Sequence, residues 1–99
     1  AIGQMTDSFR NQEGNKKSVV LVEYPRKGSW AVGFATKENT GEIKTKTNQN
    51  LVNVFVPTTP NPTSGFLLMI PKDDLIYLDM TFEEASKFIV SAGTSTPKS

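Results

Sequence analysis

Neither cysteine nor histidine occurs anywhere in this sequence. Without cysteine the chain has no disulfide, no thiol nucleophile and no cysteine ligand for zinc, and it is compatible with any redox compartment. Without histidine it lacks the side chain that most often serves as a general base near neutral pH. These absences argue against a Cys/His zinc site and against an enzyme, and no metal ion or cofactor is expected.

A strong charge of one sign is also lacking, because eleven basic residues face ten acidic ones and the formal net charge is +1. The aromatic residues stand in apolar stretches rather than among Arg and Lys, so no binding of nucleic acid is expected. The longest hydrophobic run, Phe66 to Ile70, is far shorter than the roughly 20 residues of a membrane-spanning helix. The first residues do not resemble a signal peptide, and the chain as given is expected to be soluble.

What the sequence does contain is a series of short segments with the composition or alternation of β-strands. Residues 65–70 are apolar on both faces, which predicts a strand buried on both sides. Residues 43–47 carry lysines and predict a weak strand at a sheet edge. Gly33 predicts either a close approach of another part of the molecule or a β-bulge. The expected strands are residues 18–24, 29–37, 43–47, 51–56, 65–70 and 75–78.

A helix is predicted near the end of the chain, over residues 82–92. Thr81 and Glu84 have the spacing of a capping box, with Met80 and Ala85 at the positions of a hydrophobic staple. Gly93 supplies the signal that ends the helix. The apolar residues of this segment recur with helical spacing, which predicts one face packed against a sheet.

These segments predict an α+β fold, mainly β, in which about five short strands form a twisted sheet or a small, partly open barrel. The C-terminal helix packs on it. Short links favour antiparallel pairing, although residues 57–65 are long enough for a crossover between parallel strands. The expected core is Val20, Val22, Trp30, Val32, Phe34, Val54, Val56, Leu67, Met69, Ile76, Phe88 and Ile89.

The predicted domain covers residues 18–93. Before it, Ile2, Met5 and Phe9 form a single helical stripe, and the polar residues up to position 17 predict a linker. After it, residues 94–99 predict a frayed tail.

The proline-rich loop, residues 57–65, is the most distinctive segment. Pro57, Pro60 and Pro62 restrict the backbone, so the loop is stiff before anything binds to it. One interpretation is a structural cap whose hydroxyl groups bond to the backbone. The other is a surface for a protein partner or for homo-oligomer formation. The candidate binding residues are Thr58, Thr59, Asn61, Thr63 and Ser64.

Other short motifs carry weaker signals. Arg26 and Lys27 lie in a predicted hairpin turn and are candidates for contact with a phosphate or lipid headgroup, although such pairs are normally only solvated. Asp73 and Asp74 are adjacent, and adjacent residues on an extended chain point to opposite sides, which argues against a metal site. Ser64 lacks the first glycine of a nucleophile elbow.

Two long stretches of this sequence resemble the continuous-vascular-ring-like family of bacteria and plants. They are residues 19–36, with "VEYPRKG", and residues 54–93, with "PTTPNPTSGF" and "LDMTFEEA". Members of that family are integral membrane proteins in which two N-terminal transmembrane helices precede a region similar to this one. No biochemical activity is established for the family.

The resemblance implies that this chain is the extramembrane domain of a bacterial inner-membrane protein, attached to the membrane by transmembrane helices that precede it. Residues 1–10 would then continue the second of those helices. The expected function is non-enzymatic, namely assembly or partner binding through residues 57–65. The alternative is a β-barrel module that binds a small ligand or a lipid headgroup.

Overall fold

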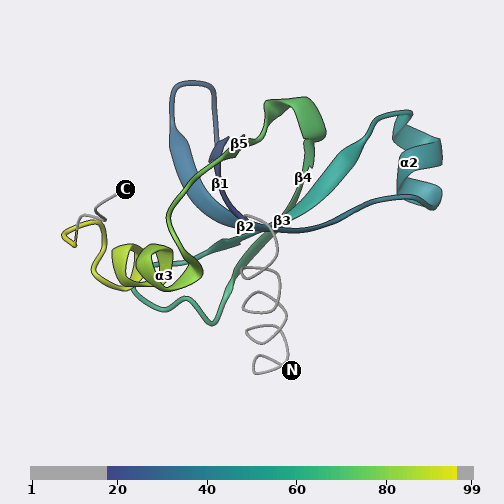
Figure 1. Ribbon diagram of the computed structural model, residues 1–99. Coiled ribbons are helices and arrows are strands. Elements are labelled where there is room, and N and C mark those ends of the chain that lie inside the picture. Colours follow the sequence, from purple (N-terminus) through teal and green to yellow (C-terminus); the bar gives the residue numbers. More distant parts are fainter. Residues whose placement is uncertain (1–17, 96–99) are drawn as a thin grey trace.

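In the computed structural model, which describes residues 18–95, the chain forms a five-stranded antiparallel sheet with strand order β4-β3-β2-β1-β5 (Figure 1). The strands are β1 (Val19–Glu23), β2 (Trp30–Glu38), β3 (Leu51–Pro57), β4 (Gly65–Pro71) and β5 (Ile76–Tyr77). One C-terminal helix, α3 (Phe82–Val90), packs on the sheet. The predicted α+β class is therefore confirmed, and the sheet is open rather than closed. The predicted N-terminal stripe, the linker and residues 96–99 lie outside the described residues.

The helix α3 begins where the sequence predicts. The Thr81 hydroxyl accepts a hydrogen bond from the Glu84 backbone N–H at 3.1 Å, and the Glu84 carboxylate accepts one from the Thr81 N–H at 2.9 Å. This reciprocal pair is the predicted capping box. The helix ends at Val90, two residues earlier than predicted, because Ala92 and Gly93 take positive φ angles of 55° and 87°.

Residues 43–47 are not a strand, and this prediction was wrong. They belong to a short exposed helix, α2 (Glu42–Thr47), which connects β2 to β3. Backbone N–H groups of Thr45 and Asn48 bond to carbonyls four residues earlier, at 3.1 and 2.8 Å. Strand preference in Ile and Thr reflects packing on a half-buried pleated surface, and this segment has no such surface beside it. Local helical bonds therefore prevail.

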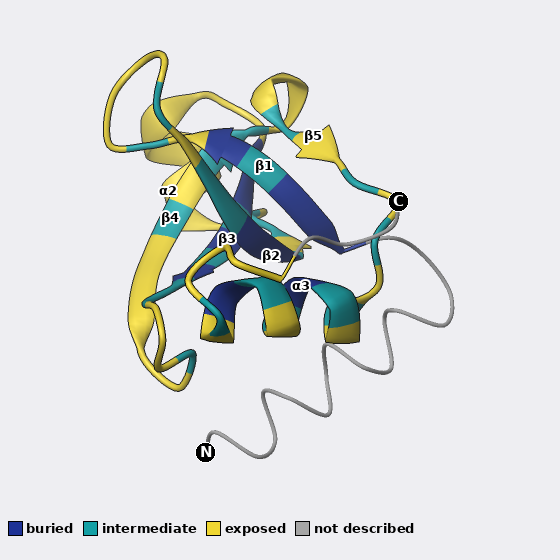
Figure 2. Ribbon diagram, turned by 90° about the vertical axis from the view of Figure 1, so that its left-hand side faces the viewer, coloured by how far each residue is buried: buried dark blue, intermediate teal, exposed yellow. Residues whose placement is uncertain are grey.

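The segment 57–65 joins antiparallel strands, so it is a hairpin loop and not a parallel crossover. The register of β3 and β4 runs from Leu51 opposite Pro71 to Pro57 opposite Gly65. The prediction that residues 65–70 are buried on both sides was wrong, because β4 is the edge strand of the sheet. Figure 2 draws β4 largely in the colour of exposed residues, whereas β1 is mostly buried.

The core has two parts, one on each face of the sheet. On the face covered by α3, Val19 and Phe34 pack with Ala85 and Ile89 of the helix. On the other face, side chains from different strands of the curved sheet pack against one another. Tyr24 directly follows β1, and Phe66 is the second residue of β4. Their ring centroids lie 6.0 Å apart although β1 and β4 are not neighbours in the sheet. The buried residues of this second part are Val20, Val22, Ala35, Val52, Val54 and Val56.

The expected core is therefore partly confirmed. Val20, Val22, Phe34, Val54, Val56 and Ile89 are buried, and Val32 and Phe88 are half-buried. Four residues are exposed, contrary to prediction: Trp30, Leu67, Met69 and Ile76. The alternation of apolar residues along a strand shows which side chains share a face, but it does not show whether anything covers that face.

Candidate interaction surface

The proline-rich loop is held together by hydrogen bonds among its own residues. The Thr58 N–H bonds to the Ser64 carbonyl at 2.8 Å and closes the base of the loop. The Thr58 hydroxyl shares its one proton between the carbonyls of Asn61 and Ser64, at 2.7 and 3.1 Å, and lies 3.1 Å from the Ser64 hydroxyl. Across the tip, the Asn61 side-chain oxygen accepts from the Thr63 hydroxyl at 2.6 Å and from the Thr63 N–H at 3.3 Å. The loop therefore has a defined shape.

The loop is also attached to the helix. The Thr59 hydroxyl donates a hydrogen bond to the backbone carbonyl of Ile89, in the last turn of α3. The structure thus brings all five candidate residues of the loop together, and each uses at least one polar group for internal bonding. Their binding role stays a prediction. Asn61 and Thr63 at the tip and Ser64 at the base are all exposed.

The edge strand β4 continues directly from the loop and presents a second, apolar part of the same surface. Phe66, Leu67 and Met69 are 53%, 67% and 42% exposed. No Asp, Glu, Lys or Arg occurs between residues 47 and 71, so the whole β3–β4 hairpin is uncharged. Large exposed apolar groups in an uncharged setting are typical of interaction sites. We call the loop and β4 together, residues 57–71, the hairpin surface.

Sequence reasoning missed the β4 part of this surface, because an apolar run at an exposed edge has the same pattern as a buried strand. The signal that was present is the uncharged stretch between Lys46 and Lys72. Edge strands are usually protected from pairing by charged residues, and β4 contains none.

Arg26 and Lys27 lie away from the loop. They line a hollow with Pro71, at the end of β4 opposite to the loop. Two carboxylates line the same hollow, those of Glu23 and Asp74, and the Glu23 carboxylate accepts the Gly28 N–H at 3.0 Å. The two cationic groups are therefore balanced by two anionic ones, which lowers the attraction of this hollow for a phosphate group.

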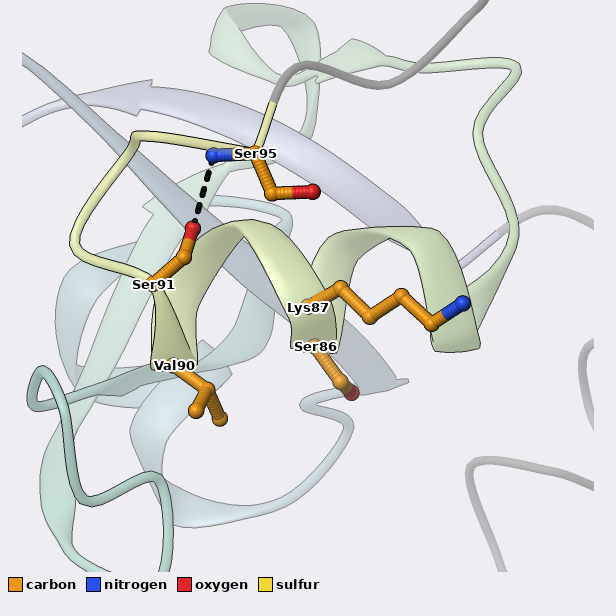
Figure 3. Close-up of a pocket in the computed structure, with 5 residues that line it drawn as sticks. All are labelled: Ser86, Lys87, Val90, Ser91 and Ser95. Carbon is orange, nitrogen blue, oxygen red and sulfur yellow. Dashed lines mark hydrogen bonds between the residues drawn. The ribbon is translucent and has the colours of Figure 1, made fainter.

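A second hollow lies on α3 and is lined by Ser86, Lys87, Val90, Ser91 and Ser95 (Figure 3). Two of its three serine hydroxyl groups bond to the helix itself. Ser86 donates to the Phe82 carbonyl at 2.8 Å and Ser91 to the Phe88 carbonyl at 3.1 Å. The Lys87 side chain extends away from Ser91 in Figure 3.

A third hollow lies between the loop base and the end of α3, beside Trp30. Its other lining residues include Pro57, Thr59, Phe88 and Ile89. Trp30 is 51% exposed, so its ring forms part of the surface next to the loop. The Thr59 hydroxyl at this hollow is already bonded to α3.

The adjacent acidic residues and the helices were the remaining candidates for a metal site and for a membrane span. Asp73 and Asp74 lie in the short 3₁₀ helix η1 (Lys72–Asp74) and are exposed. Within residues 18–95 no three His, Cys, Asp or Glu side chains are grouped closely enough to hold a metal ion. In the same part of the chain, no helix has the length and apolar character needed to cross a membrane.

The fold and these surfaces define a small α+β domain whose outstanding feature is an uncharged, partly apolar hairpin. The chain belongs to the family described as "Protein of unknown function (DUF502)", which matches residues 1–64. It is 31% identical over 83 residues to the Arabidopsis thaliana proteins "Protein LIKE COV 1" and "Protein CONTINUOUS VASCULAR RING 1". Each of these alignments covers 83% of this chain, but only 31% and 30% of those two proteins. A third relative from the same plant, "Protein LIKE COV 2", is 28% identical over 82 residues. No solved structure matches the chain.

The continuous-vascular-ring-like resemblance seen in the sequence is thus confirmed. The chain spans about a third of the length of the relatives that it matches, at 31% and 30% of two of them.

Proposed function

We propose that this chain is a non-enzymatic extramembrane domain that mediates assembly or partner binding of a membrane-embedded protein. The observation that carries the proposal is the hairpin surface, where an internally bonded loop and an uncharged strand with exposed Phe66, Leu67 and Met69 lie together. A surface with a defined shape loses little conformational entropy on binding, and exposed apolar side chains contribute free energy when a partner covers them.

The membrane setting of the proposal rests on the family resemblance and on the length of the relatives. Those relatives are about three times as long as the matched segment, so the proposal places the membrane-spanning helices in sequence that lies outside this chain. The relatives named above are plant proteins. A bacterial inner membrane as the location is a prediction from the resemblance alone.

The alternative, a module that binds a lipid headgroup or a small ligand, has less support. The hollow at Arg26 and Lys27 also contains two carboxylates, and the hollow beside Trp30 offers one hydroxyl group that is already bonded. Ligand sites usually combine an enclosed apolar cavity with a few convergent polar groups. The hairpin surface therefore supports assembly better than the hollows support ligand binding.

Photo-cross-linking in the intact membrane protein tests the proposal. A photoreactive amino acid is placed at Thr63 or at Leu67 of the hairpin surface and, as a matched control, at exposed Lys46 of α2. We expect a protein adduct in native membranes from Thr63 and Leu67 and none from Lys46. Equal yields from all three positions, or no adduct from the hairpin, would show that this surface binds no protein.

A further inference from the structure

Within residues 18–95, β4 is an edge strand, and no other strand pairs with its outer side. Two hydrogen bonds bracket its pairing with β3: Thr58 N–H to the Ser64 carbonyl and Lys72 N–H to the Asn50 carbonyl, both at 2.8 Å. Bonded and non-bonded pairs alternate along an antiparallel ladder. Ser64 and Lys72 are both bonded positions, so every second residue between them is bonded as well. The backbone groups of Phe66, Leu68 and Ile70 therefore bond to β3. The residues between them direct their backbone groups away from the sheet. In the part of the chain that the structure describes, β3 is the one strand that pairs with β4.

The outward-directed residues are Gly65, Leu67, Met69 and Pro71. The first three each offer an N–H and a carbonyl group, while Pro71 has no N–H and marks the end of the usable edge. A row of unpaired backbone groups of this kind is a template for another strand. Its length, from Gly65 to Met69, is close to that of an ordinary short strand.

The side chains and charges indicate which strand fits this edge. With no charged residue between positions 47 and 71, a second copy of β4 meets no like charge, and a charged peptide finds no complementary charge. An antiparallel pair of identical strands is related by a two-fold axis, so each copy both donates to and accepts from the other. When the pair is centred near Leu67, Leu67 and Met69 of both copies come together on one face.

The opposite edge of the sheet explains why pairing would stop at two copies. β5 contains only Ile76 and Tyr77. Asp74 and Asp79 stand close to its two ends in the sequence. A strand of two residues offers few backbone bonds, and nearby charges discourage further pairing. One long uncharged edge and one short edge with acidic neighbours favour a closed dimer over an open fibre.

We propose that two copies of this domain join through antiparallel pairing of their β4 strands, which makes one continuous sheet across the dimer. This inference rests on the proposed assembly function and names the partner as a second copy of the chain. Leu67 is the central contact, because its backbone faces the partner and its side chain is 67% exposed.

Analytical ultracentrifugation of the 99-residue chain tests the inference directly. We expect a reversible monomer–dimer equilibrium with a dissociation constant below about 1 mM. Leu67→Lys should weaken it at least about tenfold, because the two lysines would face each other across the strand pair. The matched control is Val90→Lys, which adds the same charge at a position on α3 that is 52% exposed. It should leave the equilibrium unchanged.

Because the chain has no cysteine of its own, Leu67→Cys provides a second readout. A short bis-maleimide should link two copies of the Leu67→Cys variant. The control variant Ile43→Cys, substituted on α2, should give no linked dimer. At concentrations well below the dissociation constant, where both proteins are monomeric, thermal unfolding of Leu67→Lys should match that of the parent chain, which separates loss of pairing from loss of folding.

Three outcomes would overturn the inference: a monomer at about 1 mM, a dimer that Leu67→Lys does not weaken, or open-ended polymers. These outcomes do not decide the assembly function itself. A photo-cross-link from Thr63 to a different protein, together with a monomeric chain, would retain the proposed function and remove the second copy as partner. If the chain stays monomeric and Thr63 and Leu67 give no cross-link, both the assembly function and the dimer are contradicted.

Discussion

The hydroxyl group of Thr59 donates a hydrogen bond to the backbone carbonyl of Ile89, thirty residues later in the chain. This bond joins the proline-rich loop to the last turn of α3, two segments that are far apart in the sequence. The same carbonyl accepts the Ala92 N–H at 3.1 Å, so Thr59 adds a second hydrogen bond at the C-terminal end of the helix. The loop is thereby fixed both at its base, through Thr58 and Ser64, and at its side.

Thr59→Val should release this attachment without changing the shape of the side chain. The loss of one hydrogen bond predicts a decrease in the free energy of unfolding of about 0.5–1.5 kcal/mol. Backbone amides near the loop should exchange hydrogen faster. Exchange measured by NMR checks this, with Thr40→Val at an exposed position as the control. Unchanged exchange in the loop would show that the bond to Ile89 does not hold it.

Asn61→Ala combined with Thr63→Ala should leave the fold nearly intact. Both side chains are exposed, and the bonds that close the loop base use the Thr58 hydroxyl and backbone carbonyls, which these substitutions keep. Partner binding or assembly of the intact protein should become weaker. Urea unfolding and the photo-cross-linking yield measure the two effects separately. Global unfolding of the double variant would favour the structural-cap interpretation of the loop.

The capping box of α3 predicts a selective effect at Thr81. Thr81→Ala removes the acceptor of the Glu84 N–H and should lower stability by about 1 kcal/mol. Thr81→Ser keeps a hydroxyl acceptor and should remain close to the parent chain. Chemical denaturation of the three proteins checks this order. If Ser and Ala behaved alike, the hydroxyl group would not be the source of the stabilisation.

The packing of α3 predicts that Ile89 matters more than Phe88. Ile89 is 7% exposed and packs with Val19 and Phe34, so Ile89→Ala should cost about 2–5 kcal/mol. Phe88 is only half-buried, and Phe88→Ala should cost less than the roughly 3–5 kcal/mol of a fully buried phenylalanine. Urea unfolding of both variants gives the comparison. A stable Ile89→Ala protein would contradict the placement of α3 on the sheet.

Two glycines allow close contact between neighbouring strands. A Cβ atom at Gly33 would lie 2.6 Å from Val54 Cγ1 and 3.0 Å from the Phe55 carbonyl oxygen. At Gly65 it would lie 2.2 Å from the Val56 carbonyl oxygen. Gly33→Ala should therefore cost about 1–3 kcal/mol. Gly65→Ala should cost more than that, because the backbone itself must shift.

The control for both glycines is Gly41→Ala, where a Cβ atom would meet nothing within 4 Å. Its melting temperature should stay near that of the parent chain. Equal melting temperatures for all three alanine variants would contradict the close approach of β3. The contacts at Gly33 favour the close-approach interpretation of this residue over a bulge there, and the register shift of β2 lies further along, between Ala35 and Glu38.

Several elements were predictable because their causes lie within a few residues of each other. The capping box of α3 involves Thr81 and Glu84, and the run of β-branched residues in β1 is typical of a strand. The loop residues 57–65 were recognised from their prolines. The sequence alone thus determined the fold class, the start of α3, most of the strands and the family resemblance.

Only the tertiary structure decided which apolar side chains are buried. Leu67 and Val54 have similar local sequence, yet Leu67 is 67% exposed and Val54 is fully buried, because β3 lies between two strands and β4 at the edge. Residues 43–47 form a helix, and no strand in the described part of the chain pairs with them. Burial and pairing depend on neighbours that are distant in sequence, and local residue preferences carry little information about such neighbours.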